Sequence, residues 1–254
     1  MTIRQSFAWW SFAQGSVAPA DLIQSTAEIG YDAIEMAPQE HWQTIRDQGL
    51  TLLNTQAHPL IPAGLNRLEN YDAIKAEVVR TLELATTWGL PYLICFSGDR
   101  MGLADDVGLE HTVTNLCKLV PLAEQAGVEL HLEMLNSKVD HPDYQADTTA
   151  WAVEVCKQVA SPNLKLLYDV YHMQVMEGDL IRTIQDHHES IGHYHTAGNP
   201  GRQDLDEDQE IAYPAVFRAI RDSGYTGYIG HEFVPKDDPI EALQEAYQLT
   251  ARYV

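Results

Sequence analysis

Four polar side chains in the second half of the chain have the types that bind metal ions, and each lies at the end of a short apolar run. The runs are VELHLEM, LKLLYD, SIGHYH and GYIGHEF, and the four residues are Glu133, Asp169, His195 and Glu232. Three carboxylates and one imidazole best suit an octahedral Mn²⁺ or Mg²⁺ ion, for which Co²⁺ or Zn²⁺ could substitute. Without a cation, the same groups would form a costly cluster of negative charge. The residue types therefore predict a divalent metal centre.

The alternation of side chains along a strand allows all four residues to point the same way. Successive strand residues face opposite sides, so residues two positions apart share a face. In VELHLEM the apolar positions 128, 130 and 132 share one face, which leaves Glu133 on the other. The same parity lets Asp169, His195 and Glu232 point inward as well. The alternative is four unrelated strand-end residues, each with a local partner.

Alternating strand and helix patterns run through the whole chain. Strands are predicted at 3–8, 31–36, 51–57, 91–96, 128–134, 164–169, 190–195 and 227–233. Helices are predicted at 19–29, 39–48, 70–88, 108–126, 147–160, 178–188, 213–223 and 238–252. Pro19 fits the first position of the first helix, while Gly30, Gly89 and Gly127 fit helix ends, where positive φ is needed.

Eight strands alternating with eight helices predict a parallel sheet with right-handed crossovers. Eight such units close into a (β/α)8 TIM barrel, an α/β fold whose active sites lie at the carboxyl ends of the strands. The length of 254 residues suits a single domain of this kind, spanning 1–254. An open doubly wound sheet is the alternative, but the GxGxxG fingerprint of many such folds is absent after the first strand.

Composition and charge limit the kinds of partner. The formal net charge is −21 and Lys and Arg form no cluster, which argues against nucleic acid as a ligand. Three cysteines without a CxxC pair predict reduced thiols. The N-terminal residues lack the apolar core of a signal peptide, and no stretch approaches the roughly 18 apolar residues of a membrane helix. A cytoplasmic enzyme with a small-molecule substrate is expected, and a homo-oligomer is left open.

Motifs of the second half resemble those of hydroxypyruvate isomerases, within the xylose isomerase-like, sugar-epimerase barrel superfamily. They are LEMLNSK (132–138), LLYDVYHMQVMEGDL (166–180), IGHYHTAGNPGR (191–202) and GYIGHEFVP (227–235). The resemblance implies metal ligands at Glu133, Asp169, His195 and Glu232, the four residues that parity also selects. It further implies proton transfer by the two glutamates.

The chain departs from this family at several places, including a shorter N-terminal half with a compact third loop (HPLIPAGLN). Relatives often carry Pro-Ile where this chain has Met134 and Leu135. Some hydroxypyruvate isomerases carry Gln at the position of His195, whereas related ketose epimerases carry His. These differences concern the substrate more than the metal or the type of reaction.

The reaction implied by the resemblance converts hydroxypyruvate to 2-hydroxy-3-oxopropanoate (tartronate semialdehyde), an aldose–ketose type isomerisation. Its hard step removes a proton from the carbon next to a carbonyl, and the resulting enediolate needs positive charge placed in advance, which a divalent ion supplies. One carboxylate takes the proton and another acid returns it. Glu133 and Glu232 are assigned to this catalytic pair, since the fifth and eighth strands face each other across the barrel. Their order is left open.

Five further residues are predicted to bind the substrate. His172, in the loop after the sixth strand, is expected to hydrogen-bond to substrate oxygens. Arg202, in AGNPGR, and Lys138 could hold the substrate carboxylate. His58 and Asn136 are expected at the same mouth, with a structural role as the alternative. The glycine-rich AGNPGR loop also leaves a sugar phosphate open.

Three other functions fit parts of the sequence. A ketose or keto-sugar 3-epimerase would use the same metal and the same two glutamates. A metal-dependent endonuclease would need more ligands and a basic groove, and the charge of −21 argues against it. A sugar-binding protein without turnover is disfavoured by the presence of both Glu133 and Glu232.

Overall fold

The computed structural model describes residues 3–15, 17–59 and 61–254, and these form two compact units. Unit 1 comprises Met1–Leu53, Asp179–His188 and His193–Val254, and unit 2 comprises Asn54–Gly178 and Glu189–Gly192. Parallel strands alternate with helices in both units, as the sequence predicts. The single domain over 1–254 stays a prediction. Of the helices described, none has the length and apolar character needed to cross a membrane.

Unit 1 contains parallel strands in the order β3-β2-β1-β9-β8. Their bounds are β1 (Arg4–Ala8), β2 (Ala33–Glu35), β3 (Thr51–Leu52), β8 (Ile191–Thr196) and β9 (Tyr228–His231). The first two residues of β8 belong to unit 2, so this strand runs through both units. Because parallel strands end at one edge of a sheet, this edge of unit 1 carries Glu35, His195 and Glu232.

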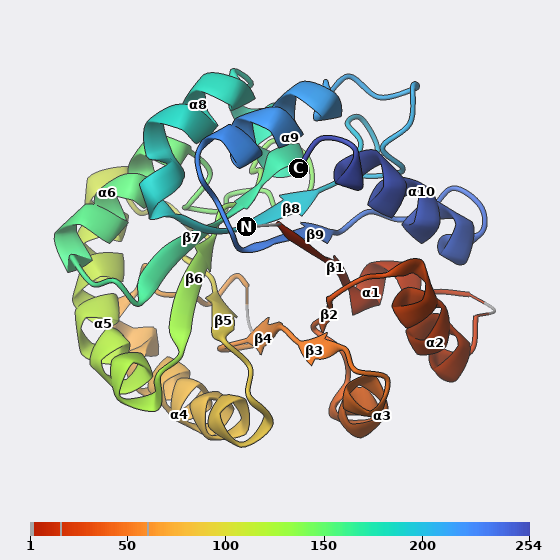
Figure 1. Cartoon of the computed structure of the whole chain (residues 1–254). Helices are drawn as coiled ribbons and strands as arrows, with labels where there is room; N and C mark the ends of the chain where they lie inside the picture. Colours follow the sequence, from red (N-terminus) through yellow and green to blue (C-terminus); the bar gives the residue numbers. More distant parts are fainter. Residues whose placement is uncertain (1–2, 16, 60) are drawn as a thin grey trace. The chain divides into compact units, whose positions relative to one another are not determined.

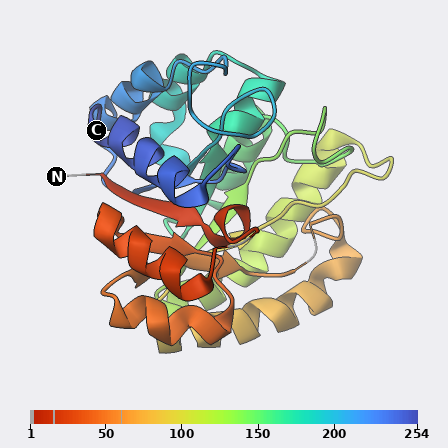
Figure 2. The ribbon, with the colours of Figure 1, turned by 90° about the vertical axis from the view of Figure 1, so that its right-hand side faces the viewer.

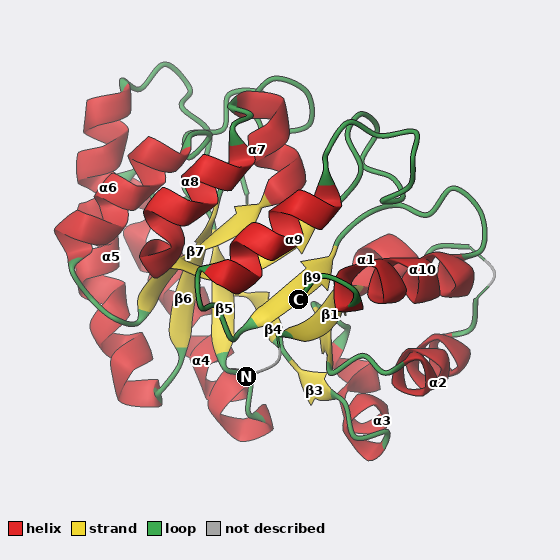
Figure 3. Cartoon of the chain, turned by 45° about the horizontal axis from the view of Figure 1, so that its top comes forward, coloured by secondary structure: helices red, strands yellow, loops and turns green. Residues whose placement is uncertain are grey.

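The helices of unit 1 flank these strands. They are α1 (Trp9–Phe12), α2 (Pro19–Ile29), α3 (Trp42–Asp47), α8 (Leu180–His187), α9 (Tyr213–Asp222) and α10 (Pro239–Ala251), with the 3-10 turns η1 (Gln39–His41) and η3 (His188–Ser190). Helix α10 packs against α2 (Figure 2). Helix α8 packs against α9 (Figure 3).

Unit 2 contains parallel strands in the order β7-β6-β5-β4, each followed by a helix. The strands are β4 (Asn54–Gln56), β5 (Tyr92–Cys95), β6 (Glu129–Glu133) and β7 (Leu164–Asp169). The helices are α4 (Tyr71–Trp88), α5 (Asp105–Ala126), α6 (Thr149–Val159) and α7 (Val170–Met176), with the 3-10 turn η2 (Leu68–Asn70). Helix α5 packs between α4 and α6, outside the strands (Figure 1).

The predicted helix signals are confirmed. Helix α2 begins at Pro19, and the helices α2, α4 and α5 are followed by Gly30, Gly89 and Gly127 in the left-handed conformation, with φ of 109°, 77° and 68°. Glycine has no Cβ to clash in this conformation, so it ends a helix at little cost.

Some elements differ from the prediction. The strand predicted at 51–57 is two short strands, β3 and β4, separated by Leu53. Helix α5 begins at Asp105, three residues earlier than predicted. The short helices α1 and α7 were not predicted, because four to seven residues are too few to show helical periodicity.

Most strand residues are buried, including polar ones. Every residue of β9 is buried, as are all residues of β8 except Gly192. Parallel strands that are covered on both faces have this pattern. Polar side chains inside such strands must find hydrogen-bond partners on neighbouring strands.

His231 shows how one such group is satisfied, and it leads to a prediction about pH. Its Nδ1 lies 2.8 Å from Oγ1 of Thr196 on β8, and its Nε2 lies 3.2 Å from Oε1 of Gln5 on β1. Burial lowers the pKa of His231 to about 3, whereas an unfolded histidine titrates at about 6.5. Between these values the unfolded chain binds a proton that the folded chain does not, so acid favours unfolding.

We therefore expect the free energy of unfolding of the metal-free protein to fall below pH 6.5, with His231 contributing up to about 1.4 kcal/mol per pH unit. Urea unfolding at pH 7 and pH 5 measures this. His231→Asn should show a smaller loss between these pH values, whereas His188→Asn should match the wild type. Equal pH dependence in wild type and His231→Asn would contradict the assignment.

Candidate active site

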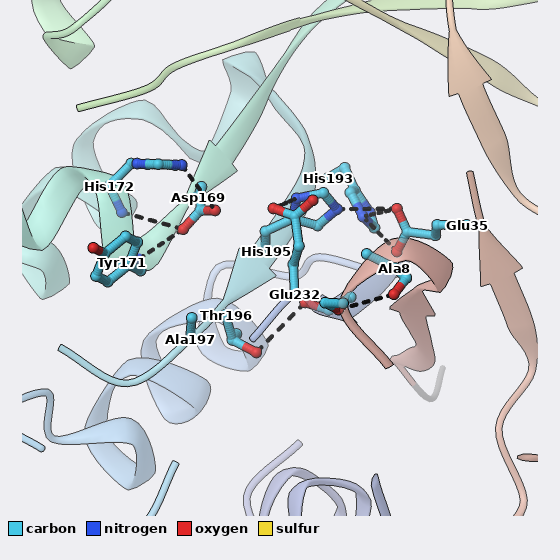
Figure 4. Close-up of polar contacts among 12 residues, drawn as sticks. Ala8, Glu35, Asp169, Tyr171, His172, His193, His195, Thr196, Ala197 and Glu232 are labelled. Carbon is cyan, nitrogen blue, oxygen red and sulfur yellow. Dashed lines mark hydrogen bonds and ion pairs between the residues drawn. The ribbon is translucent and has the colours of Figure 1, made fainter. Parts of the chain in front are cut away.

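Glu232, directly after β9, makes the central polar contacts at the carboxyl edge of unit 1. Its Oε2 lies 3.1 Å from Nδ1 of His195 and 2.6 Å from Nη2 of Arg202. Its Oε1 accepts a hydrogen bond of 2.8 Å from Nε1 of Trp10. Figure 4 shows the carboxylate of Glu232 beside the ring of His195. Three residues predicted for the site thus lie together in unit 1.

The surroundings of Glu232 keep it ionised. Burial by itself would raise the pKa of this carboxyl group, but His195, Arg202 and the bond from Trp10 together hold the pKa well below its ordinary value. An ionised carboxylate beside an imidazole nitrogen is a donor pair suited to a divalent cation.

Arg202 reaches Glu232 from the loop after β8, which backbone bonds hold in place. The carbonyl of Arg202 accepts a bond of 2.9 Å from the amide of Val234, and the amide of Gly198 donates to the carbonyl of Gln203 at 2.7 Å. The guanidinium also lies 5.2 Å from the centre of the Trp10 ring, within the range of a cation–π interaction. The predicted carboxylate-binding residue is therefore held in a defined position.

Asp169, the last residue of β7, anchors the second group of predicted residues, in unit 2. Its Oδ1 accepts hydrogen bonds from the amides of Tyr171 at 2.8 Å and His172 at 3.2 Å (Figure 4). These bonds cap helix α7, so the helix begins directly after the strand. The expected loop position of His172 was therefore wrong, because the capping by Asp169 turns this segment into helix.

His172 is held between Asp169 and Asn136. The backbone amide of Asn136 donates to Nδ1 of His172 at 3.2 Å, and the side-chain nitrogen of Asn136 lies 2.7 Å from the same atom. Since Nδ1 accepts, the ring proton is on Nε2, which lies 3.7 Å from Oδ2 of Asp169. The His172 ring can thus donate from Nε2.

Asn136 itself is engaged within unit 2. Its side-chain nitrogen donates to Asp140 at 2.6 Å, and its oxygen accepts from the amides of Val139 and Asp140. A substrate that binds Asn136 would therefore have to replace or share these hydrogen bonds. The observed contacts of this side chain support His172, and substrate binding by Asn136 stays a prediction.

Glu133, the fourth predicted ligand, ends β6 and is buried. Its carbonyl accepts a bond of 2.9 Å from the hydroxyl of Tyr144, which in turn accepts from the amide of Ser97 at 2.9 Å. Tyr144 thereby joins the ends of β5 and β6 and fixes the backbone of Glu133.

His58 and Lys138 make local contacts in unit 2. Nε2 of His58 accepts a hydrogen bond of 3.2 Å from the backbone amide of Phe96, directly after β5, so this nitrogen already has a donor. The ammonium group of Lys138 donates to the carbonyls of Val175 and Met176 at 3.1 and 2.9 Å, at the end of α7. Substrate binding by either residue stays a prediction.

Two residues in contact with the predicted ones were not identified from sequence. Glu35 ends β2 and contacts His195, and the parity rule applied to YDAIEM could have found it. Trp10 contacts Glu232 from α1, and its place directly after the first strand is the signal that could have found it.

Comparison with known proteins identifies the family. The model of the xylose isomerase-like TIM barrel matches residues 23–253. The chain belongs to this family. A putative hydroxypyruvate isomerase of Mus musculus is 31% identical over 250 residues, which cover 92% of this chain and 90% of the mouse protein. A 2-oxo-tetronate isomerase of Cupriavidus necator is 30% identical over 228 residues, which cover 85% of this chain and 87% of that protein.

Solved structures give the same fold. A D-psicose 3-epimerase from Clostridium cellulolyticum H10, crystallised with D-tagatose, superimposes with a TM-score of 0.83 over 99% of both chains, at 19% identity. The predicted TIM-barrel fold and the predicted family are therefore confirmed. This member of the xylose isomerase-like family is an isomerase.

Proposed function

We propose that this protein is a metal-dependent isomerase that interconverts hydroxypyruvate and tartronate semialdehyde. In this proposal Glu133, Asp169, His195 and Glu232 hold one Mn²⁺ or Mg²⁺ ion, for which Co²⁺ or Zn²⁺ could substitute. The observation that carries the metal site is the buried pair of Glu232 and His195, whose facing oxygen and nitrogen lie 3.1 Å apart. The names of the similar proteins supply the substrate.

The geometry of this pair fits a six-coordinate ion. Two neighbouring ligands of an octahedral ion with bonds of about 2.1 Å stand about 3.0 Å apart. The 3.1 Å between Nδ1 of His195 and Oε2 of Glu232 agrees with this spacing. The bonds from Arg202 and Trp10 orient the same carboxylate, and a carboxylate has about four lone-pair positions, so it can accept these bonds and still serve as a ligand.

The TIM-barrel fold supports joining the pair of unit 1 with Glu133 and Asp169 of unit 2. In such a barrel the carboxyl ends of all strands surround one mouth. When β3 and β4 are taken as halves of one strand, β6, β7, β8 and β9 are the fifth to eighth strands. The four proposed ligands then stand at the ends of four consecutive barrel strands.

The proposed chemistry moves one proton between neighbouring carbons. One member of the pair Glu133 and Glu232 starts ionised and takes the proton from C3 of hydroxypyruvate, while the other starts protonated and gives its proton to C2, so that the two exchange protonation states in one turnover. The hydroxyl proton moves from the oxygen on C3 to the oxygen on C2, which relocates the carbonyl. The cation, when bound, supplies positive charge for the enediolate. His172, with its proton on Nε2, is proposed to donate to a substrate oxygen.

Arg202 is proposed to bind the substrate carboxylate. A guanidinium carries five N–H donors in a planar fork, so Arg202 can serve Glu232 and a carboxylate together. Lys138 and His58 would join only if the substrate displaces their present bonds. A local positive group also offsets the repulsion between an acidic protein and an anionic substrate.

The test is product identification by ¹³C NMR. Purified protein with Mn²⁺ or Mg²⁺ is incubated with hydroxypyruvate labelled at C3, and the signal of the hydrated aldehyde of tartronate semialdehyde is expected to appear. In parallel, 2-oxo-tetronate is tested because one similar protein is named for it. Absence of the hydrated aldehyde from hydroxypyruvate and of the 3-oxo acid from 2-oxo-tetronate, with metal bound and the protein folded, would reject the proposal.

A ketose or keto-sugar 3-epimerase is the second candidate. The feature that favours it is His195, because related ketose epimerases have histidine at this position. An epimerase keeps the carbonyl at C2 and inverts the configuration at C3. Incubation with D-psicose or D-fructose would then yield the C3 epimer, and no aldehyde signal would appear.

Asn136→Asp tests the proposed donor role of His172. An aspartate here would place an acceptor beside Nδ1 of His172, which favours moving the ring proton from Nε2 to Nδ1. We expect kcat to fall by about tenfold to a hundredfold, as when supporting residues around a catalytic site are changed. Steady-state kinetics and ¹⁵N NMR of the histidine rings measure the effect. Asn136→Ala, which keeps the backbone donor, should lose less, and equal losses in both variants would contradict this role.

A further inference from the structure

Glu35, at the end of β2, forms a second buried polar group with two histidines of β8. Its Oε2 lies 3.0 Å from Nε2 of His195, and both of its oxygens lie 3.1 Å from Nε2 of His193. All three side chains are fully buried in unit 1. Figure 4 shows Glu35 on one side of the His195 ring and Glu232 on the other.

The contacts of Glu35 define the hydrogen-bond direction. Its two oxygens face Nε2 of both histidines at 3.0 to 3.1 Å, and Oε1 also accepts a bond from the hydroxyl of Ser6, so this carboxyl group is surrounded by hydrogen-bond donors. An ionised carboxylate can only accept hydrogen bonds. Both histidines must therefore carry a proton on Nε2 and donate it to Glu35.

Neighbouring strands are shaped to accept this carboxylate. The hydroxyl of Ser6 on β1 donates to Oε1 of Glu35 at 2.6 Å. On β9, a Cβ atom at Gly230 would lie 2.1 Å from the same oxygen. Glycine at 230 therefore leaves the space that Glu35 occupies. Donors on two strands and a gap on a third make this a built site for one anionic side chain.

We propose that Glu35 is a positioning residue that holds His195 with its proton on Nε2 and thereby presents Nδ1 to the cation beside Glu232. This inference rests on the metal site of the proposed function. Carboxylates that hold metal-binding histidines in one tautomer recur in metalloproteins, and their removal weakens metal binding about tenfold to a hundredfold. In this role Glu35 acts through the imidazole ring of His195.

The cluster of Glu35, His193 and His195 has two alternative roles that can be tested. The ligand atoms of Glu35, His193 and His195 lie within 4.8 Å of one another, so they could hold a second ion. A neutral imidazole has one unprotonated nitrogen, so His195 cannot offer Nδ1 to the ion beside Glu232 and Nε2 to a second ion, which favours a hydrogen-bonded group. A role in core stability alone is the other alternative.

Glu35→Gln and Ser6→Ala separate these roles. Glutamine has one accepting oxygen and one donating nitrogen, so it cannot accept from both histidines. We expect Glu35→Gln to bind Mn²⁺ about tenfold to a hundredfold more weakly by calorimetric titration, and to alter the visible absorption spectrum of bound Co²⁺. Ser6→Ala removes a different hydrogen bond to the same carboxylate but keeps the bond between Oε2 of Glu35 and His195. This variant should therefore bind Mn²⁺ and Co²⁺ like the wild type. Thermal unfolding of the metal-free variants shows whether each one folds.

Three outcomes would overturn the inference. In the first, Glu35→Gln binds Mn²⁺ like the wild type and its Co²⁺ spectrum is unchanged. In the second, Ser6→Ala loses as much metal affinity as Glu35→Gln. In the third, the wild type binds two ions per chain and Glu35→Gln binds one.

The wild-type protein allows a test even if Glu35→Gln fails to fold. In ¹⁵N NMR of metal-free protein at pH 8, assigned with His195→Gln, Nε2 of His195 should be a protonated, pyrrole-type nitrogen. An unprotonated Nε2 would overturn the inference. This measurement needs neither metal nor substrate, so failure of the proposed reaction would leave its result standing.

Discussion

Glu232→Gln is expected to lower kcat for isomerisation by about 10² to 10⁴-fold, the range typical of a lost general acid or base. The glutamine keeps the shape of the side chain but can neither take a proton nor match the charge of a carboxylate ligand. It also loses the ion pair with Arg202, for which Nη2 and Oε2 lie 2.6 Å apart in the wild type. We expect Glu133→Gln to lose activity in the same range.

Glu129→Gln is the matched control. Glu129 lies at the opposite end of the same strand as Glu133, four residues before it, where its carboxylate pairs with Nε2 of His131 at 2.8 Å. It is partly exposed and remote from the end of β6, so its variant should turn over like the wild type. The double variant of Glu133 and Glu232 should be little slower than either single one, because residues acting as one unit are not additive. Wild-type rates in both single variants would reject the proposed mechanism.

Removal of the metal is expected to abolish turnover, and addition of Mn²⁺ or Mg²⁺ should restore it. The metal also binds only the folded chain in this proposal, so it should stabilise the protein by about 2.7 kcal/mol at a metal concentration of 100 times Kd. For a chain of this size, that corresponds to a rise in Tm of roughly 5 to 10 °C. Chelation and dialysis followed by activity assay, elemental analysis and thermal unfolding measure both effects.

His195→Gln and Asp169→Asn are informative in the same experiment. Both should reduce the rise in Tm produced by added metal, whereas the control Glu129→Gln should keep it. Full activity in protein that retains less than one metal ion per several chains would contradict metal dependence. A metal-induced rise in Tm without isomerase activity would support the proposed metal site and contradict the proposed substrate.

Much of the fold could be predicted because its signals are local. Glycines at 30, 89 and 127 end helices since only glycine adopts positive φ without strain. Apolar runs locate the strands, and parity within each run places Glu133 and Asp169 at carboxyl ends. The helix α7 escaped prediction because its seven residues are too few to show helical periodicity.

The contacts of the candidate site were harder to predict, because they join residues far apart in the chain. Glu35 meets His195 across a separation of 160 residues, and Trp10 meets Glu232 across 222. The sequence places Asn136 after a strand and predicts contact with substrate, but it gives no sign that the amide of Asn136 also contacts His172. No spacing within the sequence distinguishes a ligand from a residue that supports one.

By itself, the sequence determined which segments are strands and helices, which strand ends carry ionisable groups, and the family to which the chain is similar. These properties follow from short-range sterics and from the period of each element. Only the tertiary structure decided that His195 stands between Glu35 and Glu232, and that Arg202 is paired with Glu232. The physical reason is that the direction of a side chain is a local property of its strand, whereas its partners depend on the order in which distant strands align.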